Sequence, residues 1–321
     1  MIGEKQCSYK LTERLGKLGG SMNKELKSTL KPIASMYREK IENTINFIQK
    51  SIIKSPTIKG IDCIVKNIVE KKCSLSRFGD GELNLIWGED IGFQKYDEKL
   101  ANRLKEILGS NREKMLIAIP DVFDSLDEYS SEVDVKYWRR QLIFNRWKWY
   151  KYMDMSNIYY NAFISRPYII YRDRSNSYEK FQLVKRIWDK KDILIVEGKE
   201  SRLGIGNDLF NNCNSMKRIL CPSENCFLKY NQILRSVKKN INSELVLIAL
   251  GPTASVLAYD LNESNIQAVD IGHIDIEYEW FLKGCTKKEK IYGKYTNECY
   301  HTNVESINDL LYKDQIIDVI D

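Results

Sequence analysis

Ser76-Arg77-Phe78-Gly79-Asp80-Gly81-Glu82 is the stretch from which the prediction of the fold starts. It closes an apolar run over residues 73–78 that predicts a buried strand, and it then passes through two glycines into a helical pattern. Two carboxylates two residues apart on such a turn can bind one hard cation together. An Asp-Gly pair is also an ordinary turn dipeptide, so this stretch alone does not decide between a metal site and a turn.

The same arrangement occurs three more times along the chain. In each case a short apolar run ends in glycine and polar residues, and a helical pattern follows at once or soon after. The runs cover residues 193–196, 245–250 and 266–271. Near-continuous apolar strands that alternate with helices indicate parallel strands covered on both faces. We therefore predict an α/β fold with a Rossmann-like, mostly parallel sheet and helices on both faces.

The four turns that follow these strands are expected to share one site, because ligands of open α/β sheets bind beyond the carboxyl ends of the strands. They would bring carboxylates, glycine-rich backbone, Lys199 and Arg202 around one crevice. Either cation could equally be a surface charge. Gly251 opens a helix whose N–H groups could bind a phosphate, although Thr253 could instead be an ordinary N-cap.

Composition is typical of a globular protein. The chain has 321 residues and a net charge of +6, which is too mild to indicate nucleic acid by itself. No stretch approaches the roughly 20 apolar residues of a membrane span. Residues 1–20 are charged and lack an apolar signal core, so we expect a cytoplasmic protein. The eight cysteines lack metal-type pairing, and we expect them to be reduced thiols.

The N-terminal part of the chain differs from the rest. Residues 1–60 are rich in lysine, show helical periodicity around residues 36–50, and contain a Ser-Pro break at Ser55-Pro56. We predict a helical N-terminal extension over residues 1–60 and one α/β domain over residues 61–321.

An aromatic and basic helix is predicted over residues 133–153. Trp138, Trp147 and Trp149 alternate there with other aromatic residues, arginines and lysines. Such a helix can bury its aromatic stripe in the core while the cations reach solvent. It can also lie on an anionic membrane surface or stack on nucleic-acid bases. The sequence favours the core, and leaves the other two open.

Five segments together resemble the bacterial GT-D-fold glycosyltransferases. They are Ser76-Arg77-Phe78-Gly79-Asp80-Gly81-Glu82, Phe163-Ile164-Ser165-Arg166-Pro167, residues 196–210, Leu250-Gly251-Pro252-Thr253-Ala254 and residues 270–280. They occur in the order of the family and cover roughly residues 61–300, whereas residues 1–60 have no counterpart. Some members continue into a second transferase domain that is absent here, so we expect a single-domain enzyme or one that acts with a partner.

The resemblance implies a metal-dependent transferase that moves a hexose, typically glucose from UDP-glucose, to a glycan acceptor. Asp80 and Glu82 match the Asp-x-Glu motif that binds Mn²⁺ (or Mg²⁺). The residues expected around the nucleotide sugar are Arg77, Gly79, Gly81, Arg166, Lys199, Arg202, Gly204, Gly251 and Thr253. We expect a role in surface polysaccharide or glycoprotein glycan synthesis. The acceptor could be lipid- or protein-linked, with peripheral contact at the inner membrane face and no nucleic-acid partner.

Attack by an acceptor hydroxyl requires the loss of a proton, so such a site needs a base. Asp275 is the first candidate, Glu277 the second and His273 the third. A helix that begins at Ile274 would place Asp275 and Glu279 on one face and turn Glu277 away. Two alternatives remain open: another nucleotide-processing enzyme, such as a nucleotidyltransferase or phosphohydrolase, and a non-catalytic protein that binds nucleic acid or membrane.

Overall fold

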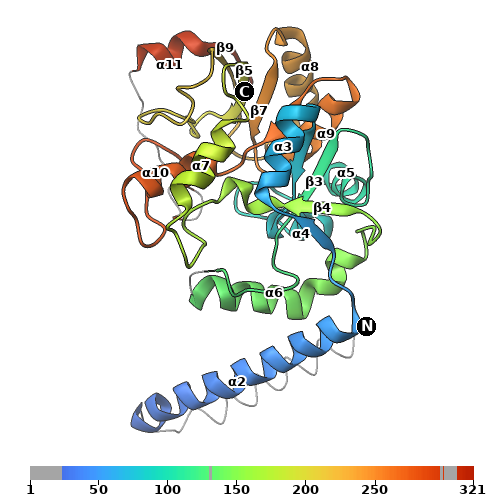
Figure 1. Cartoon of the computed structure of the whole chain (residues 1–321), viewed down its shortest axis with the longest axis vertical. Helices are drawn as coiled ribbons and strands as arrows, with labels where there is room; N and C mark the ends of the chain where they lie inside the picture. The colour runs from blue at the N-terminus through green and yellow to red at the C-terminus, as the bar shows by residue number, and fades with distance from the viewer. Residues whose placement is uncertain (1–23, 130–131, 297–298, 300–308) are drawn as a thin grey trace. The chain divides into compact units, whose positions relative to one another are not determined.

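The computed structural model of the chain describes residues 24–129, 132–296, 299 and 309–321 (Figure 1). It divides into two compact units, Met1–Ile53 and Lys54–Asp321. The first 23 residues of the predicted N-terminal extension lie outside the described residues.

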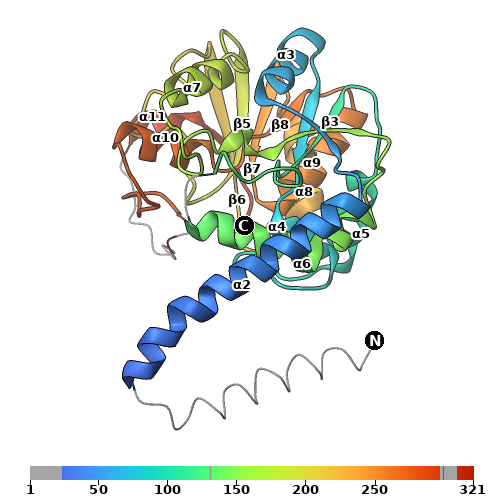
Figure 2. The same cartoon turned by 60° about the horizontal axis from the view of Figure 1, so that its bottom comes forward.

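The described part of the first unit forms one long helix, α2 (Lys24–Ile52), which Figure 2 shows along its length. Ile41, Ile45, Ile48 and Ile52 recur every three or four residues and therefore share one side of the helix. Their side chains are exposed, from 36% for Ile45 to 76% for Ile52. The predicted N-terminal helix is thus confirmed, and it extends beyond residues 36–50, where the sequence shows helical periodicity.

The second unit is built on one sheet of nine strands in the order β1-β4-β3-β2-β8-β7-β5-β6-β9. Every pair of neighbouring strands is parallel. The strands are β1 (Thr57–Lys59), β2 (Ser74–Arg77), β3 (Met115–Ile119), β4 (Ile158–Asn161), β5 (Asp192–Gly198), β6 (Ser215–Cys221), β7 (Leu245–Ala249), β8 (Ala268–Asp270) and β9 (Ile316–Val319).

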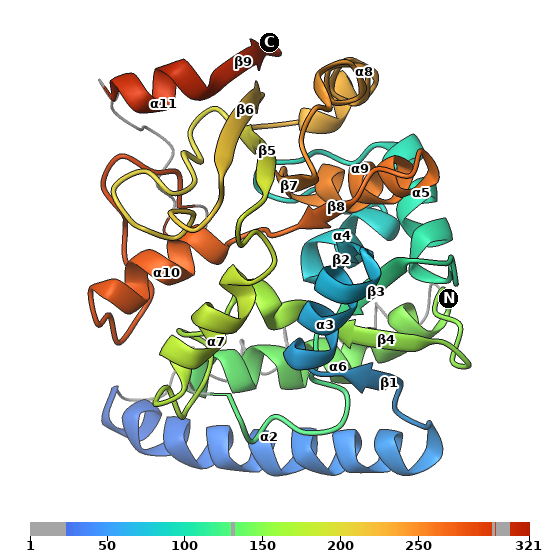
Figure 3. The same ribbon diagram turned by 45° about the horizontal axis from the view of Figure 1, so that its top comes forward.

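Helices cover both faces of this sheet, as Figure 3 shows, with α5, α8 and α9 on one face and α3, α7 and α10 on the other. The connecting elements are α3 (Ile61–Lys71), α4 (Asp80–Ile86), α5 (Glu98–Leu108), α6 (Glu132–Tyr150), η2 (Ala162–Ser165), α7 (Ser177–Lys185), η3 (Cys226–Lys229), α8 (Tyr230–Asn240), α9 (Pro252–Glu263), α10 (Ile274–Leu282) and α11 (Leu310–Gln315). The predicted fold class is confirmed.

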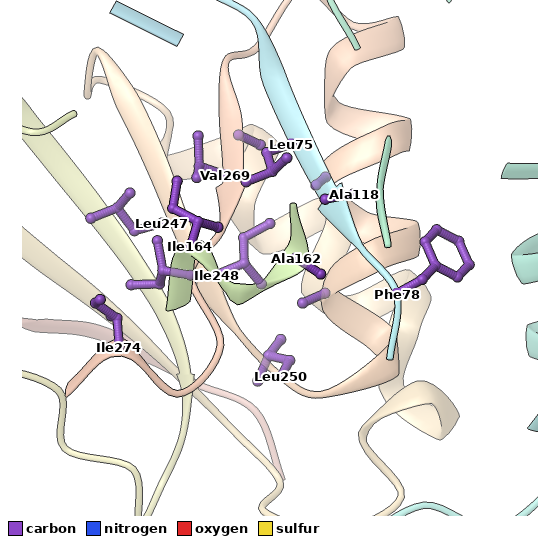
Figure 4. Close-up of a cluster of buried hydrophobic side chains, with 14 of the residues drawn as sticks. Leu75, Phe78, Ala118, Ala162, Ile164, Leu247, Ile248, Leu250, Val269 and Ile274 are labelled. Atoms are coloured by element: carbon purple, nitrogen blue, oxygen red, sulfur yellow. The ribbon is translucent and has the colours of Figure 1, made fainter. Parts of the chain in front are cut away.

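The core lies along the central strands, because their residues are covered from both sides. The four apolar residues of β7 from Leu245 to Ile248 have no exposed surface. Figure 4 shows Leu247 and Ile248 of β7 in one cluster with Leu75 of β2 and Val269 of β8. This double-sided burial explains why these strands are continuous apolar runs and do not alternate.

Two features of the sheet bear on the sequence predictions. The four strands predicted to precede the site are β2, β8, β7 and β5, and they are consecutive neighbours in the sheet. The sheet also begins before the predicted domain boundary at residue 61, because β1 (Thr57–Lys59) pairs with β4. The second unit accordingly starts at Lys54.

Candidate functional site

A cavity of about 700 Å³ lies at the carboxyl ends of the four central strands. Residues 79–82 after β2, 272–273 after β8, 250–251 after β7 and Gly198 at the end of β5 all line it. The prediction that four loops share one crevice is confirmed. A volume of this size is in the usual range for sites that hold small molecules, about 300–1,000 Å³.

The Asp-x-Glu stretch forms the start of α4, with Gly79 as its N-cap. Asp80 is the first residue of the helix, and its Oδ2 accepts a hydrogen bond from the hydroxyl of Tyr137 on α6. Glu82 turns back toward the N-cap, where its Oε2 accepts a hydrogen bond of 2.7 Å from Gly79 N. Burial raises the pKa of Glu82 from its ordinary value of 4.5 to about 7, and the charge of Asp270 also raises it.

These two carboxylates fit a hard divalent cation. Both residues line the cavity, and both offer oxygen atoms, which Mg²⁺ and Mn²⁺ prefer. Within the described part of the chain, no group of three or more His, Cys, Asp or Glu side chains is arranged to hold a metal ion. A cation bound to Asp80 and Glu82 would therefore take further ligands from substrate oxygens and water.

Arg77 lines the cavity and holds three segments of its wall together. Its Nε donates to the carbonyl of Asp270 at 3.0 Å, its Nη2 donates to the Asp270 carboxylate at 2.9 Å, and its Nη1 donates to Ser165 Oγ at 2.6 Å. Gly272 has a φ of +42°, and a Cβ there would lie 1.8 Å from Arg77 Nη2. The glycine is thus required by the position of Arg77, whose donors are committed to protein groups.

The turn after β7 presents glycine backbone to the cavity. Gly251 is the N-cap of α9 and has a φ of +53°, and a Cβ there would lie 2.4 Å from the ring of Phe93. Gly251 and Phe93 both line the cavity. Thr253 is fully buried and does not line it, so its side chain is not placed to contact a ligand there.

The loop after β5 is anchored by a buried ion pair between neighbouring strands. Glu197 and Arg218 have no exposed side-chain surface, and their Oε1 and Nη1 atoms are 2.5 Å apart. Glu197 Oε2 accepts a hydrogen bond from Leu203 N at 2.7 Å, and Arg218 Nη2 donates to the carbonyl of Leu203 at 2.8 Å. The backbone N–H and the carbonyl of Leu203 are therefore both held by these two charged side chains.

The two cations predicted for this loop lie away from the cavity lining. Lys199 forms an ion pair with Asp321. Arg202 is 9% exposed, and its Nη1 donates to the carbonyl of Gly293 at 2.8 Å. Gly204 also lies outside the lining, and its N–H donates to Asp275. The structure thus brings Gly198, Ser201 and Leu203 of this loop to the cavity, rather than Lys199, Arg202 or Gly204.

The three candidate bases lie at the start of α10, which begins at Ile274 as expected. His273, its N-cap, and Asp275 line the cavity, whereas Glu277 does not. Asp275 Oδ2 is 2.7 Å from Lys294 Nζ, and Asp275 Oδ1 accepts hydrogen bonds from Gly204 N and Asn207 Nδ2. The expected shared face of Asp275 and Glu279 is confirmed, because Lys294 and Asn207 contact both.

Glu277 is fully buried and holds the segment that follows η2. Its Oε2 accepts a hydrogen bond of 2.9 Å from Ile169 N, and its Oε1 lies 3.8 Å from Arg166 Nη1. Arg166 lines the cavity. Glu277 therefore supports a residue of the cavity wall and does not reach the cavity itself.

A second wall of the cavity was missed by the sequence analysis. It is formed by the first half of α6 and by segments near it, and it includes Asp134, Tyr137, Trp138, Phe163 and Lys288. Arg166 lies in the same wall and is the one of these residues that the sequence analysis expected near the ligand. The aromatic content of α6 was visible in the sequence, but the pattern did not distinguish a cavity wall from a core helix or a membrane-binding helix.

A model of the glycosyltransferase GT-D fold family matches residues 75–299. The chain belongs to this family. The match begins inside β2, just before the Asp-x-Glu stretch, and it continues past α10, so it contains all four loops that line the cavity from the central strands.

Solved structures resemble this GT-D chain over most of its length. One, described as the highly conserved domain of unknown function 1792 with a distinct glycosyltransferase fold, has a TM-score of 0.82 and 40% identity. It matches 86% of this chain and 100% of that one. A glycosyltransferase of the same domain type from Streptococcus sanguinis has a TM-score of 0.80 and 38% identity, and the match covers 83% of this chain and 100% of that one.

Two curated streptococcal proteins are also similar. The glycosyltransferase GlyD of Streptococcus pneumoniae serotype 4 (strain ATCC BAA-334 / TIGR4) is 38% identical over 276 residues, which are 84% of this chain and 34% of GlyD. The probable glycosyl transferase Gly of Streptococcus gordonii is 40% identical over 265 residues, which are 81% of this chain and 38% of Gly. The GT-D chain thus spans little more than a third of either relative.

Proposed function

We propose that this GT-D chain transfers a hexose, glucose in the first instance, from a UDP-sugar to a glycan acceptor in a metal-dependent reaction. The observation that carries the proposal is the position of Asp80 and Glu82. Both lie in the first turn of the helix after β2, line the shared cavity, and fall within the residues that match the family model. A divalent cation held there would neutralise the diphosphate that leaves with the nucleotide.

The remaining parts of the cavity fit the nucleotide and the proton transfer. The backbone of Gly251 opens α9 toward the cavity and is suited to a phosphate. Of the three candidate bases, Asp275 is engaged by Lys294, and Glu277 lies outside the cavity lining. His273 lines the cavity, and we therefore place it first as the group that takes the acceptor proton.

The test is UDP-glucose turnover by chelator-treated protein, with and without added Mn²⁺ and with and without glycan acceptors. We expect turnover to require the metal and to be abolished by Asp80→Asn and by Glu82→Gln. Glu89→Gln is the matched control, because Glu89 is a 57% exposed carboxylate that pairs with Lys148 and does not line the cavity. Near-wild-type rates in the Asp80 or Glu82 variants would contradict the proposal.

The same assay separates the alternative activities. Transfer produces UDP together with an acceptor of higher mass, whereas a phosphohydrolase releases products at a rate that does not depend on the acceptor. A nucleotidyltransferase would instead attach the nucleotide to the acceptor, and mass spectrometry of the product would show it.

A further inference from the structure

The cavity has two chemically different walls. The loops after the central strands supply glycine backbone and the carboxylates Asp80 and Glu82. The second wall consists of the aromatic rings of Tyr137, Trp138 and Phe163, with charged side chains beside them. The proposed nucleotide and metal use the first wall and leave the second without a role.

The aromatic side chains of the second wall are held in place. Asp134, Tyr137 and Trp138 are spaced i, i+3 and i+4 on α6 and so share one face of the helix. Trp138 contacts Tyr137 edge to face at 5.5 Å between ring centroids, and it contacts Phe163 in the same way at 5.9 Å. Trp138 is thus fixed from two sides while it lines the cavity.

Polar groups surround these rings. Asp134 Oδ1 lies 3.7 Å from Lys288 Nζ, and the two side chains are 23% and 33% exposed. Arg166 is 20% exposed and lines the same wall. A ring face flanked by a carboxylate, an amine and a guanidinium matches a sugar ring, which has apolar C–H faces and a rim of hydroxyl groups.

The second wall also lies next to the proposed reaction centre. The hydroxyl of Tyr137 donates to Asp80, so this wall meets the first one at the Asp-x-Glu motif. A nucleobase, in contrast, is separated from the transferred sugar by the diphosphate, and Phe93 beside Gly251 offers an aromatic ring in that other part of the lining. These positions favour the acceptor sugar over the nucleobase as the ligand that contacts the second wall.

We propose that Trp138 is the stacking platform for the acceptor sugar and that Asp134 binds its hydroxyl groups. This assignment rests on the proposed glycosyl transfer and names the subsite that accepts the sugar.

The experiment measures binding of methyl and p-nitrophenyl glycosides of glucose, galactose and N-acetylhexosamines by saturation-transfer NMR, with UDP and diamagnetic Mg²⁺ present. Wild-type protein should bind at least one of them. Trp138→Ala should weaken that binding about tenfold or more, as for an aromatic anchor, while calorimetric UDP affinity stays unchanged. Trp138→Phe should restore part of the glycoside binding, because it retains an aromatic face.

Two further variants test whether a loss of glycoside binding is specific to the second wall. Trp147→Ala is the matched control, because Trp147 lies on the same helix, is 53% exposed and packs against Trp87 outside the cavity lining. It should bind glycosides as the wild type does. Asp134→Asn removes a charge without removing a packed ring, and it should weaken glycoside binding even if Trp138→Ala fails to fold.

Several results would overturn the assignment. One is wild-type protein that binds UDP but none of the glycosides. Another is glycoside binding that stays unchanged in Asp134→Asn and in a folded Trp138→Ala protein. A selective loss of UDP affinity in Trp138→Ala would assign the ring to the nucleobase instead. Wild-type protein that neither binds UDP nor turns over UDP-sugars would contradict the proposed function itself, which is a different outcome.

Discussion

Asp275 and Lys294 form a buried ion pair, with 2.7 Å between Oδ2 and Nζ and side-chain exposures of 4% and 3%. The pair connects α10 to the segment that contains Lys294, and the other oxygen of Asp275 holds the backbone N–H of Gly204. Asp275 therefore joins two loops near the cavity. A carboxylate committed in this way is poorly suited to accept a proton from substrate, because protonation would break the contacts that hold the loops.

The first prediction follows from this arrangement. Asp275→Asn should lower the free energy of unfolding by about 3 kcal/mol, because it leaves the buried Lys294 with Glu279 as its remaining carboxylate. Urea denaturation measures the change. Lys283→Ala is the control. The side chain of Lys283 is 50% exposed, and its Nζ lies 3.8 Å from Glu279 Oε2, which makes a loose surface ion pair. Its loss should lower the free energy of unfolding by less than about 1 kcal/mol. An Asp275→Asn protein as stable as the wild type would disprove the structural role.

The second prediction concerns Gly272. Gly272→Ala should destabilise the protein by about 1–3 kcal/mol, because φ is +42° and the new Cβ would displace Arg77 from its ion pair with Asp270. Gly60→Ala provides the comparison, since Gly60 has a φ of −68° and a Cβ there would meet nothing within 4 Å. Differential scanning calorimetry should show a lower unfolding temperature for Gly272→Ala alone. Equal effects of the two substitutions would refute the explanation.

The third prediction is a pH dependence of metal-free protein. The pKa of Glu82 is raised by burial from 4.5 to about 7, so between these values the folded protein keeps a proton that the unfolded chain has released. The contribution of Glu82 to stability therefore falls as pH rises through this window. Glu82→Gln removes that loss, so in chelator it should gain stability relative to wild type on going from pH 5 to pH 8. A constant difference between the two proteins at both pH values would contradict the raised pKa.

The central strands could be predicted from the sequence because burial on both faces makes them continuous apolar runs. β6 was missed because Ser215–Cys221 contains Lys217 and Arg218, which are untypical of a buried strand. Arg218 is tolerated there because it pairs with Glu197, 21 residues earlier and on the neighbouring strand. Such a pairing depends on the order of strands in the sheet, which no local pattern reveals.

The candidate site, like the sheet, could be predicted from the sequence in part. The positions of Asp80 and Glu82 followed from a glycine-rich turn at the end of a strand, which is a local feature. The environment of Asp275 did not, because Lys294 lies 19 residues further along the chain and nothing in the local sequence pairs the two. Trp138 was hidden for another reason: aromatic residues on a helix have the same spacing whether they face a core, a cavity or solvent.

The last prediction concerns contact of α6 with membranes. None of the helices among the described residues has the length and hydropathy of a membrane span. Trp149 is 2% exposed and belongs to the core, while Phe144 and Trp147 are 66% and 53% exposed. Tyr137 is also 40% exposed, but its hydroxyl donates to Asp80, so Phe144 and Trp147 alone offer little apolar surface for insertion into a bilayer.

A cation of α6, Lys148, and the lysine directly after the helix, Lys151, are also partly engaged. Lys148 and Lys151 lie over the ring of Trp87, at 5.5 and 4.9 Å from its centroid. Transfer of these charges to anionic headgroups would give up those contacts, which offsets part of the roughly 1 kcal/mol that each charge could gain. We therefore expect Phe144→Ser/Trp147→Ser protein to co-sediment with anionic vesicles to the same extent as wild type, at low and at high salt. If wild type pellets at low salt and the double variant stays in the supernatant, α6 is a membrane-binding helix after all.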